Sequence, residues 1–419
     1  MSSPVWHPFT QHALQPQAIE IARGEGAWLE SVDGKRLLDL ISSWWVVTHG
    51  HRHPRIVQAI KDQADQLDQV IFAGFTHRPA EDLARRLLAR VGGQLAHVFY
   101  SDSGSTAVEV ALKMALGFWR NRGEARTRIV TLEHAYHGDT IGTMSAGARG
   151  VFNAAYEPLL FDVVRLPFPH PGQEERTLAA LDDACRAGDV AALIVEPLLL
   201  GAGGMLTYSA ETLRAMQDIC ARSGALLIAD EVLTGFGRTG AFTACGQAGV
   251  TPDIMCLAKG ITGGSMPLAV TLCSRAIFDA HYSTDRAKTF YHSSSYTANP
   301  IACAAAVANL DIWDAEPVQH RVDAIALWQK DFMQSFADDA RFANARTCGT
   351  ISAIDLVVSD EGYLAGVGPR LYDFFIARGL LLRPLGNTIY LMPPYCVTRD
   401  ELAGAYAAIR DAAGMIGGR

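Results

Sequence analysis

Two short runs near the amino terminus predict a β-hairpin. Ala27–Val32 and Lys35–Leu40 each have strand length and carry several apolar side chains, and Asp33-Gly34 stands between them. An Asp-Gly pair between two such runs is typical of a tight turn that joins antiparallel strands. We therefore expect two paired strands at this end of the chain.

From about residue 55, helical stretches alternate with short apolar runs. Two of the helical stretches are Thr106–Arg120 and Ala210–Ser223. The apolar runs are rich in Val, Ile and Leu, and they are His97–Tyr100, Arg128–Leu132, Ala191–Glu196, Ala225–Ala229 and Ile254–Leu257. Because the apolar residues in these strands are continuous and do not alternate with polar ones, both faces should be buried. The pattern predicts an α/β fold with a mostly parallel sheet covered by helices.

The pattern changes again after about residue 312. A long amphipathic helix is expected over Val318–Asp338, and strand-like and helical pieces follow it. We predict a large domain over residues 55–312. A smaller α+β domain would be built from both chain ends, residues 1–54 and 313–419.

Composition narrows the class of protein. The chain is 49% hydrophobic and 19% charged with a net charge of −8, which excludes intrinsic disorder and does not favour nucleic-acid binding. No apolar run reaches the roughly 18 residues of a membrane span. No secretory signal is visible, and none of the eight cysteines forms a C-x-x-C pair. We expect a cytoplasmic protein with reduced thiols and no membrane or nucleic-acid partner.

A carboxylate and a lysine follow two of the predicted strands. Asp230 ends the strand Ala225–Ala229, and Lys259 follows Ile254–Leu257. The carboxyl ends of parallel strands share the ligand-binding edge of a sheet, so the two side chains should meet there. A desolvated lysine is nucleophilic, and a lysine with a nearby carboxylate is what pyridoxal phosphate requires. A capping Asp and a snorkelling Lys would give the same pattern.

A phosphate-binding site near Asp230 and Lys259 would favour the interpretation that they bind pyridoxal phosphate. Val98–Thr106 has the pattern strand, small-residue turn, helix, so the N–H groups of Gly104 and Ser105 would face an anion. A helix start that is merely capped by a serine side chain would have the same sequence pattern. Tyr136 also follows a strand and could cover an aromatic ring, and Glu196 ends another strand at the same edge.

Three other interpretations of the sequence compete with this one. Gly235–Gly240 fits G-x-G-x-x-G, but the residues after it are a poor helix start, which disfavours a nicotinamide or flavin oxidoreductase. His49, His51 and His53 could share one face and bind zinc, yet Gly50 interrupts the strand and no fourth ligand is near, so we expect no metal. A non-enzymatic regulator would not need Asp230 and Lys259 together.

The stretch Ile228–Gly240 followed by Leu257–Gly260 resembles the signature of the class III aminotransferases, which have fold type I and use pyridoxal phosphate. Further segments resemble the class III enzymes of biotin biosynthesis, and the similarity extends from Trp6 to about Tyr395: Trp6–Thr10, Ser42–Trp45 with His49–Pro54, and Leu382–Gly386 with Ile389–Tyr395. The resemblance implies transamination of 8-amino-7-oxononanoate to 7,8-diaminononanoate with S-adenosylmethionine as donor. Another ω-aminotransferase, acting on ornithine, GABA or a diamine, is the alternative.

The resemblance also implies roles for single residues toward the cofactor. Lys259 matches the lysine that bonds to the cofactor's aldehyde and moves protons. Asp230 matches the partner of the pyridine nitrogen, and Tyr136 the tyrosine beside cofactor and substrate. Gly104 and Ser105 match the phosphate cradle.

On the substrate side, Trp44 matches a wall of the pocket and Arg383 the arginine that receives a substrate carboxylate. Phe9 stands where the family usually has a tyrosine, so a hydroxyl is lost beside the substrate.

The stretch His292–Pro300 aligns with the segment that crosses a dimer interface in the family. The resemblance therefore implies a homodimer with shared active sites. Within this segment, Ser293, Ser294 and Ser295 replace the more usual Gly-Pro-Thr. Ser294 and Ser295 would lie at the partner's phosphate, where Ser295 keeps a hydroxyl. Ser293 would add a side chain beside the partner's substrate.

Overall fold

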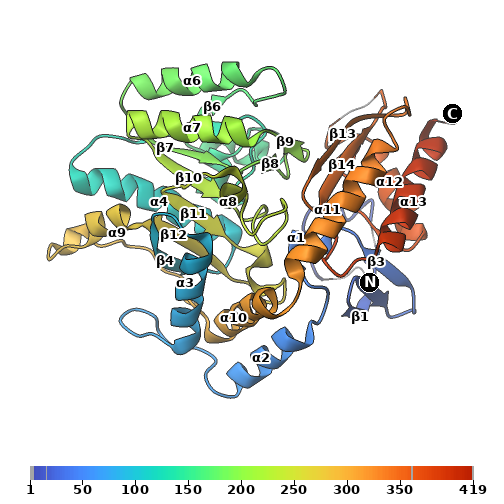
Figure 1. Ribbon diagram of the computed structural model, residues 1–419, viewed down its shortest axis with the longest axis horizontal. Coiled ribbons are helices and arrows are strands. Elements are labelled where there is room, and N and C mark those ends of the chain that lie inside the picture. The colour runs from blue at the N-terminus through green and yellow to red at the C-terminus, as the bar shows by residue number, and fades with distance from the viewer. Residues whose placement is uncertain (1–3, 16, 360–361, 418–419) are drawn as a thin grey trace.

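The computed structural model describes residues 4–15, 17–359 and 362–417. Its elements form a larger lobe around one broad sheet and a second lobe that contains both ends of the described chain (Figure 1). The fold is α/β with a mixed, mostly parallel sheet, as the sequence predicts.

The broad sheet has seven strands in the order β4-β12-β11-β10-β7-β5-β6. Their bounds are β4 Leu95–Ser101, β5 Arg128–Leu132, β6 Val164–Leu166, β7 Val190–Val195, β10 Leu226–Asp230, β11 Ile254–Leu257 and β12 Ala269–Ser274. The pairs from β6 to β11 are parallel, as expected. The apolar pattern did not reveal β12, which runs antiparallel to both β11 and β4.

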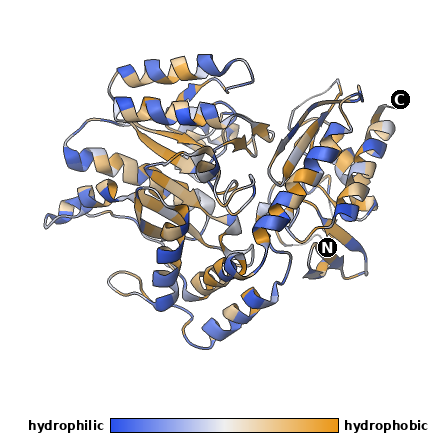
Figure 2. Cartoon of the chain, in the orientation of Figure 1, coloured by the Kyte–Doolittle hydropathy of each residue, from blue (hydrophilic) through white to orange (hydrophobic). Residues whose placement is uncertain are grey.

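Both faces of this sheet are covered, which explains why its strands are mostly apolar and do not alternate between apolar and polar residues. In β10, Leu226 and Ile228 pack with α4 (Gly104–Arg122) on one face, whereas Leu227 and Ala229 join the core on the other. The hydrophobic colour concentrates on these strands in Figure 2. The other helices around the sheet are α2 Pro54–Ala64, α3 Arg78–Val91, α6 Glu174–Arg186, α7 Ala210–Ser223, α9 Arg275–His281 and α10 Pro300–Ala315.

The second lobe joins distant parts of the chain. The predicted hairpin is confirmed, with Trp28 opposite Leu38 in an antiparallel pair. The strand β1 Ile21–Glu25 pairs with β2 Trp28–Ser31 at the surface. The other elements share one hydrophobic core: β2, β3 Arg36–Asp39, α11 Val318–Gln334, β13 Phe342–Cys348, β14 Ile351–Leu356, α12 Val367–Ala377, β15 Leu380–Leu381, β16 Thr388–Leu391 and α13 Arg399–Gly417.

The helix α11 ends earlier than its sequence pattern indicates. The amphipathic pattern continues to Asp338, but the helix ends at Gln334. Phe336 then turns into the core and meets Phe342 with ring centroids 4.9 Å apart. Burial of this aromatic ring outweighs the continuation of the helix.

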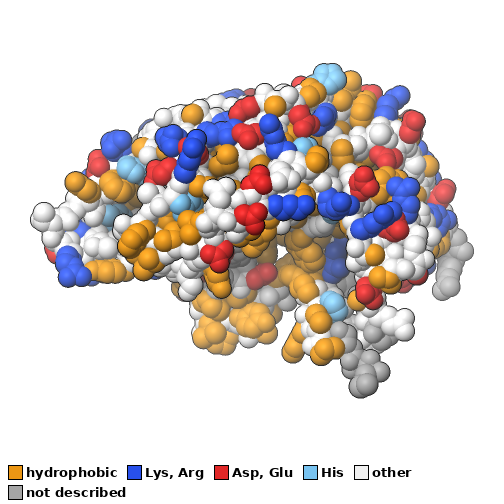
Figure 3. All heavy atoms as spheres, turned by 90° about the horizontal axis from the view of Figure 1, so that it is seen from below, with side chains coloured by type: hydrophobic (Ala, Val, Ile, Leu, Met, Phe, Trp, Pro, Cys, Tyr) orange, Lys and Arg blue, Asp and Glu red, His pale blue; other side chains and the backbone are white. Residues whose placement is uncertain are grey.

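The remaining elements are short: α1 Ser42–Trp45, α5 Ile141–Ala146, η1 Ala154–Leu159, β8 Leu199–Leu200, β9 Leu206–Thr207, α8 Ala244–Ala248, η2 Lys259–Thr262 and η3 Arg286–Lys288. Among the described residues, no helix is both long and apolar enough to cross a membrane. Seen from below, the surface carries mixed charges and several patches of hydrophobic side chains (Figure 3).

Candidate active site

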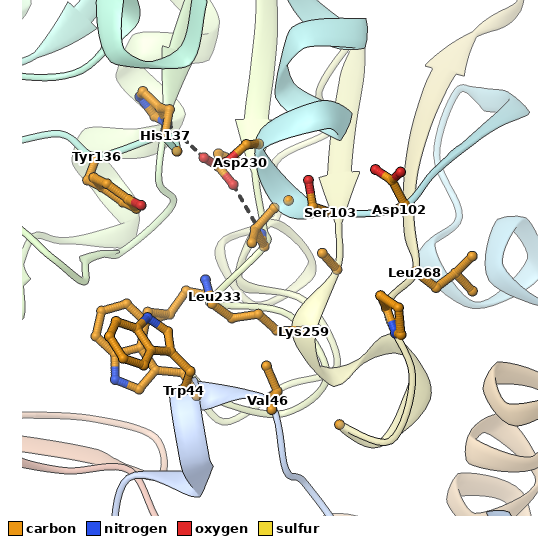
Figure 4. Close-up of a pocket in the computed structure, with 18 of the residues that line it drawn as sticks. Trp44, Val46, Asp102, Ser103, Tyr136, His137, Asp230, Leu233, Lys259 and Leu268 are labelled. Carbon is orange, nitrogen blue, oxygen red and sulfur yellow. Dashed lines mark hydrogen bonds and ion pairs between the residues drawn. The ribbon is translucent and has the colours of Figure 1, made fainter. Parts of the chain in front are cut away.

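A cavity of about 410 Å³ opens at the carboxyl ends of β10 and β11. Asp230 and Lys259 both line it, so the structure brings together the pair that the sequence predicts (Figure 4). Trp45, Tyr136 and Glu196 also line this cavity. Its position at the carboxyl edge of a parallel sheet is the usual place for a ligand in such folds.

The carboxylate of Asp230 is buried and held by two donors. His137 Nδ1 donates to Asp230 Oδ2 at 2.7 Å, and the Val232 N–H donates to Oδ1 at 3.1 Å. The His137 ring is itself buried, and its Nε2 lies 3.4 Å from Thr131 Oγ1. Sequence reasoning assigned no role to His137, although it stands beside Tyr136. The two donors fix the orientation of the carboxylate toward the cavity.

Lys259 begins the turn η2 with a φ of 42°, a conformation that side chains other than glycine rarely adopt. Asn309 holds this turn by donating to the carbonyls of Gly260 and Ile261, both at 3.0 Å. Among the described residues the Lys259 ammonium has no hydrogen-bond acceptor, and it lies 5.2 Å from the centroid of the Trp45 ring. Burial lowers the pKa of Lys259, against the opposing attraction of Asp230 and Glu196. A lowered pKa favours the neutral, nucleophilic amine.

The amino end of α4 forms another wall of the cavity. Ser103 is the N-cap, and its Oγ accepts from the Thr106 N–H at 3.2 Å. The N–H groups of Gly104 and Ser105 belong to the first turn, which leaves them without partners inside the helix. A Cβ at Gly104 would lie 2.6 Å from Val232 Cγ1, so the backbone approaches too closely for any other residue. Exposed N–H groups and the helix dipole together favour an anion.

Tyr136 and Glu196 are linked at the side of the cavity. The Tyr136 N–H donates to Glu196 Oε1 at 3.1 Å, and the Gly201 N–H donates to Oε2 at 2.9 Å. Burial raises the pKa of Glu196 to about 7. Burial also raises the pKa of the Tyr136 hydroxyl, which keeps that group protonated at neutral pH.

A smaller aromatic cavity adjoins the first and shares Trp44, Trp45 and Tyr136 with it. Arg383 lies in its wall and donates from Nη2 to the Phe9 carbonyl at 2.9 Å. Its guanidinium carbon lies 5.4 Å from the centroid of the Trp44 ring. No carboxylate among the described residues pairs with Arg383, so a cation faces a cavity lined mainly by aromatic and aliphatic side chains.

The serines of the predicted interface segment line neither cavity of their own chain. Ser294 Oγ donates to Asp102 Oδ2 at 3.1 Å, Ser293 Oγ donates to the Ser294 carbonyl, and the Ser295 carbonyl accepts from Gln69. A single chain therefore does not bring Ser293 or Ser295 to the site.

The two alternative sites suggested by the sequence, a dinucleotide-binding loop and a histidine metal site, do not have the geometry that those functions require. No helix opens at the loop Gly235–Gly240, since the next helix, α8, begins at Ala244 and is five residues long. His49, His51 and His53 point to three different partners, which are Asn309, Asp39 and Glu316. Within residues 4–15, 17–359 and 362–417, no three His, Cys, Asp or Glu side chains form a metal site.

Comparison with known proteins identifies relatives of this chain in sequence and in structure. A Synechococcus elongatus protein named adenosylmethionine-8-amino-7-oxononanoate aminotransferase is 49% identical over 416 residues, 97% of either chain. The crystal structure of an enzyme of that name from Methanocaldococcus jannaschii has 32% identity and a TM-score of 0.93, over 98% of this chain and 97% of that one. A PLP-bound amine transaminase from an uncultivated Pseudomonas species has 35% identity and a TM-score of 0.94 over the full length of both.

The family described as aminotransferase class-III matches residues 9–413. Its members depend on pyridoxal phosphate. This chain therefore belongs to the class III aminotransferases and is a pyridoxal-phosphate-dependent enzyme.

Proposed function

We propose that the enzyme transfers an amino group from S-adenosylmethionine to 8-amino-7-oxononanoate, which gives 7,8-diaminononanoate in biotin biosynthesis. The relatives whose names state this pair of compounds align with nearly the whole chain. The observation that carries the proposal is Arg383, which has no carboxylate partner among the described residues and lies in the aromatic cavity that adjoins the cavity of Lys259. Such a cavity suits an acceptor with a long apolar chain and a terminal carboxylate.

The residues of the main cavity fit pyridoxal phosphate. The ammonium of Lys259 lacks a hydrogen-bond acceptor there, as an amine that bonds to the cofactor's aldehyde requires. We propose that Gly104 and Ser105 hold the phosphate and that Asp230 pairs with the ring nitrogen. Tyr136 would lie beside both cofactor and substrate. When bound, the cofactor supplies an aldehyde that carries the amino group and a ring that takes up the electron pair of a broken C–H bond.

In this proposal the chain's own side chains move and hold protons. The neutral Lys259 amine takes the proton from the substrate carbon that bears nitrogen and later returns one to the acceptor carbon. Its lowered pKa suits both steps. Asp230, fixed by His137, keeps a proton on the ring nitrogen. Donor and acceptor would use the same cavity in turn, so its walls must accept both.

Arg383 is the proposed carboxylate receptor because its planar guanidinium can donate two parallel hydrogen bonds. Its Nη2 already donates to the Phe9 carbonyl, and this hydrogen bond fixes the guanidinium group beside the Trp44 ring. The rings of Phe9, Trp44 and Phe152 lie in edge or tilted contact, with centroids within 6 Å of a neighbour. An aliphatic chain can pack along this aromatic wall up to the arginine.

Half-reaction spectra test the proposed donor. Holoenzyme in the pyridoxal form is mixed with S-adenosylmethionine, ornithine, GABA or a diamine, and conversion to the pyridoxamine form is followed by absorbance. We expect rapid conversion with S-adenosylmethionine, and then recovery of the pyridoxal spectrum on addition of 8-amino-7-oxononanoate. Conversion only by the other amines, with no recovery, would assign the chain to the broader ω-aminotransferases.

Phe9→Tyr is expected to raise kcat/KM for 8-amino-7-oxononanoate. The Phe9 ring borders the aromatic cavity, 5.6 Å from Trp44 between centroids, so a hydroxyl there adds one hydrogen bond toward the acceptor. A bond to a neutral partner contributes about 0.5–1.5 kcal/mol, which corresponds to roughly 2- to 12-fold in kcat/KM. Steady-state kinetics with varied acceptor measure the change.

The donor half-reaction of Phe9→Tyr should keep its wild-type rate. Phe161→Tyr is a matched control, because Phe161 has the same 44% exposure as Phe9 but lines neither cavity. An altered cofactor spectrum and donor rate with an unchanged acceptor reaction would place residue 9 on the donor side.

We further propose that the enzyme is a homodimer in which Ser293, Ser294 and Ser295 complete the site of the second copy. The adjoining loops are tied together, since Asn299 donates to the Asp68 carbonyl and Gln69 donates to that of Ser295. These loops expose large hydrophobic side chains, namely Ile71, Phe75, Tyr291 and Tyr296, each more than 60% exposed. Clustered apolar exposure of this kind is typical of a protein interface.

Complementation tests shared sites. Lys259→Ala and Ser295→Ala chains, each impaired alone, are unfolded, mixed and refolded with cofactor. In a mixed dimer one site carries both lesions and the other carries neither, so random pairing should restore about a quarter of wild-type activity. A fully active monomer in sedimentation velocity would contradict the proposal.

We propose a cytoplasmic location because the cysteines form no disulfide bonds. All eight are free thiols, and six of them are buried. Reduced, packed thiols are typical of a reducing compartment.

A further inference from the structure

Three residues of the turn that carries Trp44 and Trp45 have a left-handed backbone. The φ angles of Ser42, Ser43 and Trp45 are 52°, 59° and 66°, and Ser43 combines its value with a ψ of −106°. Residues other than glycine rarely adopt such angles, and they persist only where surrounding contacts impose them. A run of this kind beside an active site needs an identifiable support.

Asp39, at the end of β3, supplies that support. Its side chain is fully buried, and its two oxygens accept from both sides of the turn. Oδ1 accepts from the Ile41 N–H at 3.3 Å, and Oδ2 accepts from the Ser43 N–H at 2.7 Å. A buried carboxylate is tolerated only when it is paired and hydrogen-bonded. His51 Nε2 lies 2.8 Å from Oδ2 and completes the set.

This turn also positions Trp44 and Trp45, which form two walls of the site. The Trp45 ring lies 5.2 Å from the Lys259 ammonium, and its Nε1 donates to Tyr390 Oη at 2.9 Å. Trp44 contacts Phe9 and Arg383 in the aromatic cavity. Any relaxation of the backbone at Ser43 therefore moves both indoles relative to the groups that bind cofactor and substrate.

We propose that Asp39 and His51 form a positioning pair that sets the Trp44–Trp45 turn and, through Trp44, the fit of the substrate. The proposal rests on the proposed function only in taking this cavity as the substrate site. Neither side chain lines the main cavity or the aromatic cavity, so the pair acts through the turn.

The variants are chosen in pairs. His51→Leu removes the donor to Asp39, whereas His51→Gln keeps a donor on a polar side chain. His53→Leu is the matched control, because His53 has similar exposure, 15% against 14%, but bonds to Glu316 and not to the turn. Asp39→Asn changes the acceptor while keeping its shape.

The first measurement uses apoenzyme labelled with 5-fluorotryptophan. Fluorine NMR resonances of Trp44 and Trp45 are assigned with Trp44→Phe and Trp45→Phe. We expect His51→Leu and Asp39→Asn to shift or broaden these two resonances and to leave the other tryptophans unchanged. His51→Gln and His53→Leu should retain the wild-type spectrum. This measurement needs no substrate, so it stands even if the proposed acceptor is wrong.

The second measurement uses holoenzyme. His51→Leu should raise KM for the acceptor on the order of 10-fold with a much smaller change in kcat, because the contacts displaced are those that orient the substrate. Bound cofactor should stay at one per chain. Unchanged Trp44 and Trp45 resonances in folded His51→Leu and Asp39→Asn would overturn the proposal. Failure of both variants to fold would assign the pair to the fold alone and overturn it equally. If wild-type enzyme fails to use 8-amino-7-oxononanoate, the proposed function fails, while the fluorine spectra still decide the role of the pair.

Discussion

Lys259→Ala is expected to abolish transamination while the chain still folds and binds pyridoxal phosphate without a covalent bond. The variant loses the acid–base group at the reacting carbon, a loss that alone costs on the order of 10²–10⁴-fold in rate. It also loses the amine that bonds to the cofactor. Together these losses should lower kcat by on the order of 10⁴-fold or more.

Borohydride reduction gives a readout that is independent of turnover. Treatment of wild-type holoenzyme followed by peptide mass analysis should find the cofactor mass on the peptide that contains Lys259. The variant should show no such peptide, although dialysis and absorbance should still detect bound cofactor. Lys330→Ala, on the exposed face of α11, is the control and should behave as wild type. A covalent cofactor on another lysine of the Lys259→Ala chain would refute the assignment.

Asp230→Asn is expected to cost about 3 kcal/mol of transition-state stabilisation, which corresponds to roughly 100- to 200-fold in kcat. Asparagine has the same shape, and its single oxygen can still accept from the Val232 N–H while its NH2 group donates to the unprotonated Nδ1 of a neutral His137, so the geometry of the site should survive. It cannot hold a proton on the ring nitrogen, and a neutral pyridine withdraws electrons poorly. The measurement is kcat per bound cofactor, with occupancy determined by absorbance.

Asp253→Asn is the matched control for this change. Asp253 also adjoins the sheet, but at its opposite edge, where it accepts from the Leu227 N–H at 2.8 Å. Its substitution should lower the stability of the fold and leave kcat per bound cofactor close to wild type. A near-normal kcat in Asp230→Asn, or an equal loss in both variants, would exclude the proposed role of Asp230.

The local pattern of the sequence predicted the frame of the larger lobe well. Apolar runs such as Arg128–Leu132 and Ile254–Leu257 are strands with the predicted bounds, because a strand buried on both faces leaves an uninterrupted apolar signal. The strand β12, Ala269–Ser274, was missed, although all six of its residues are buried. Its antiparallel direction depends on its pairing with β11 and β4, which no local feature of the sequence indicates.

The candidate site was predicted less evenly. Asp230 and Lys259 were found because each follows a recognisable strand, and parallel topology brings strand ends together. His137 was missed because its function depends on a partner 93 residues away in the chain. The role of Asp39 was hidden for the same reason, since nothing local distinguishes a carboxylate that supports a strained turn from one on the surface.

By itself, therefore, the sequence determined the family, the alternation of strands and helices, and the chemical types gathered at the sheet edge. These features depend on residues close together in the chain or on long signatures such as Ile228–Gly240. Only the tertiary structure decided which charges are buried and paired. Asp230 meets His137, Asp39 meets His51, and Arg383 remains without a carboxylate among the described residues. Pairing and burial arise from contacts between distant segments, and the free energy of a buried charge depends on those contacts and not on its neighbours in sequence.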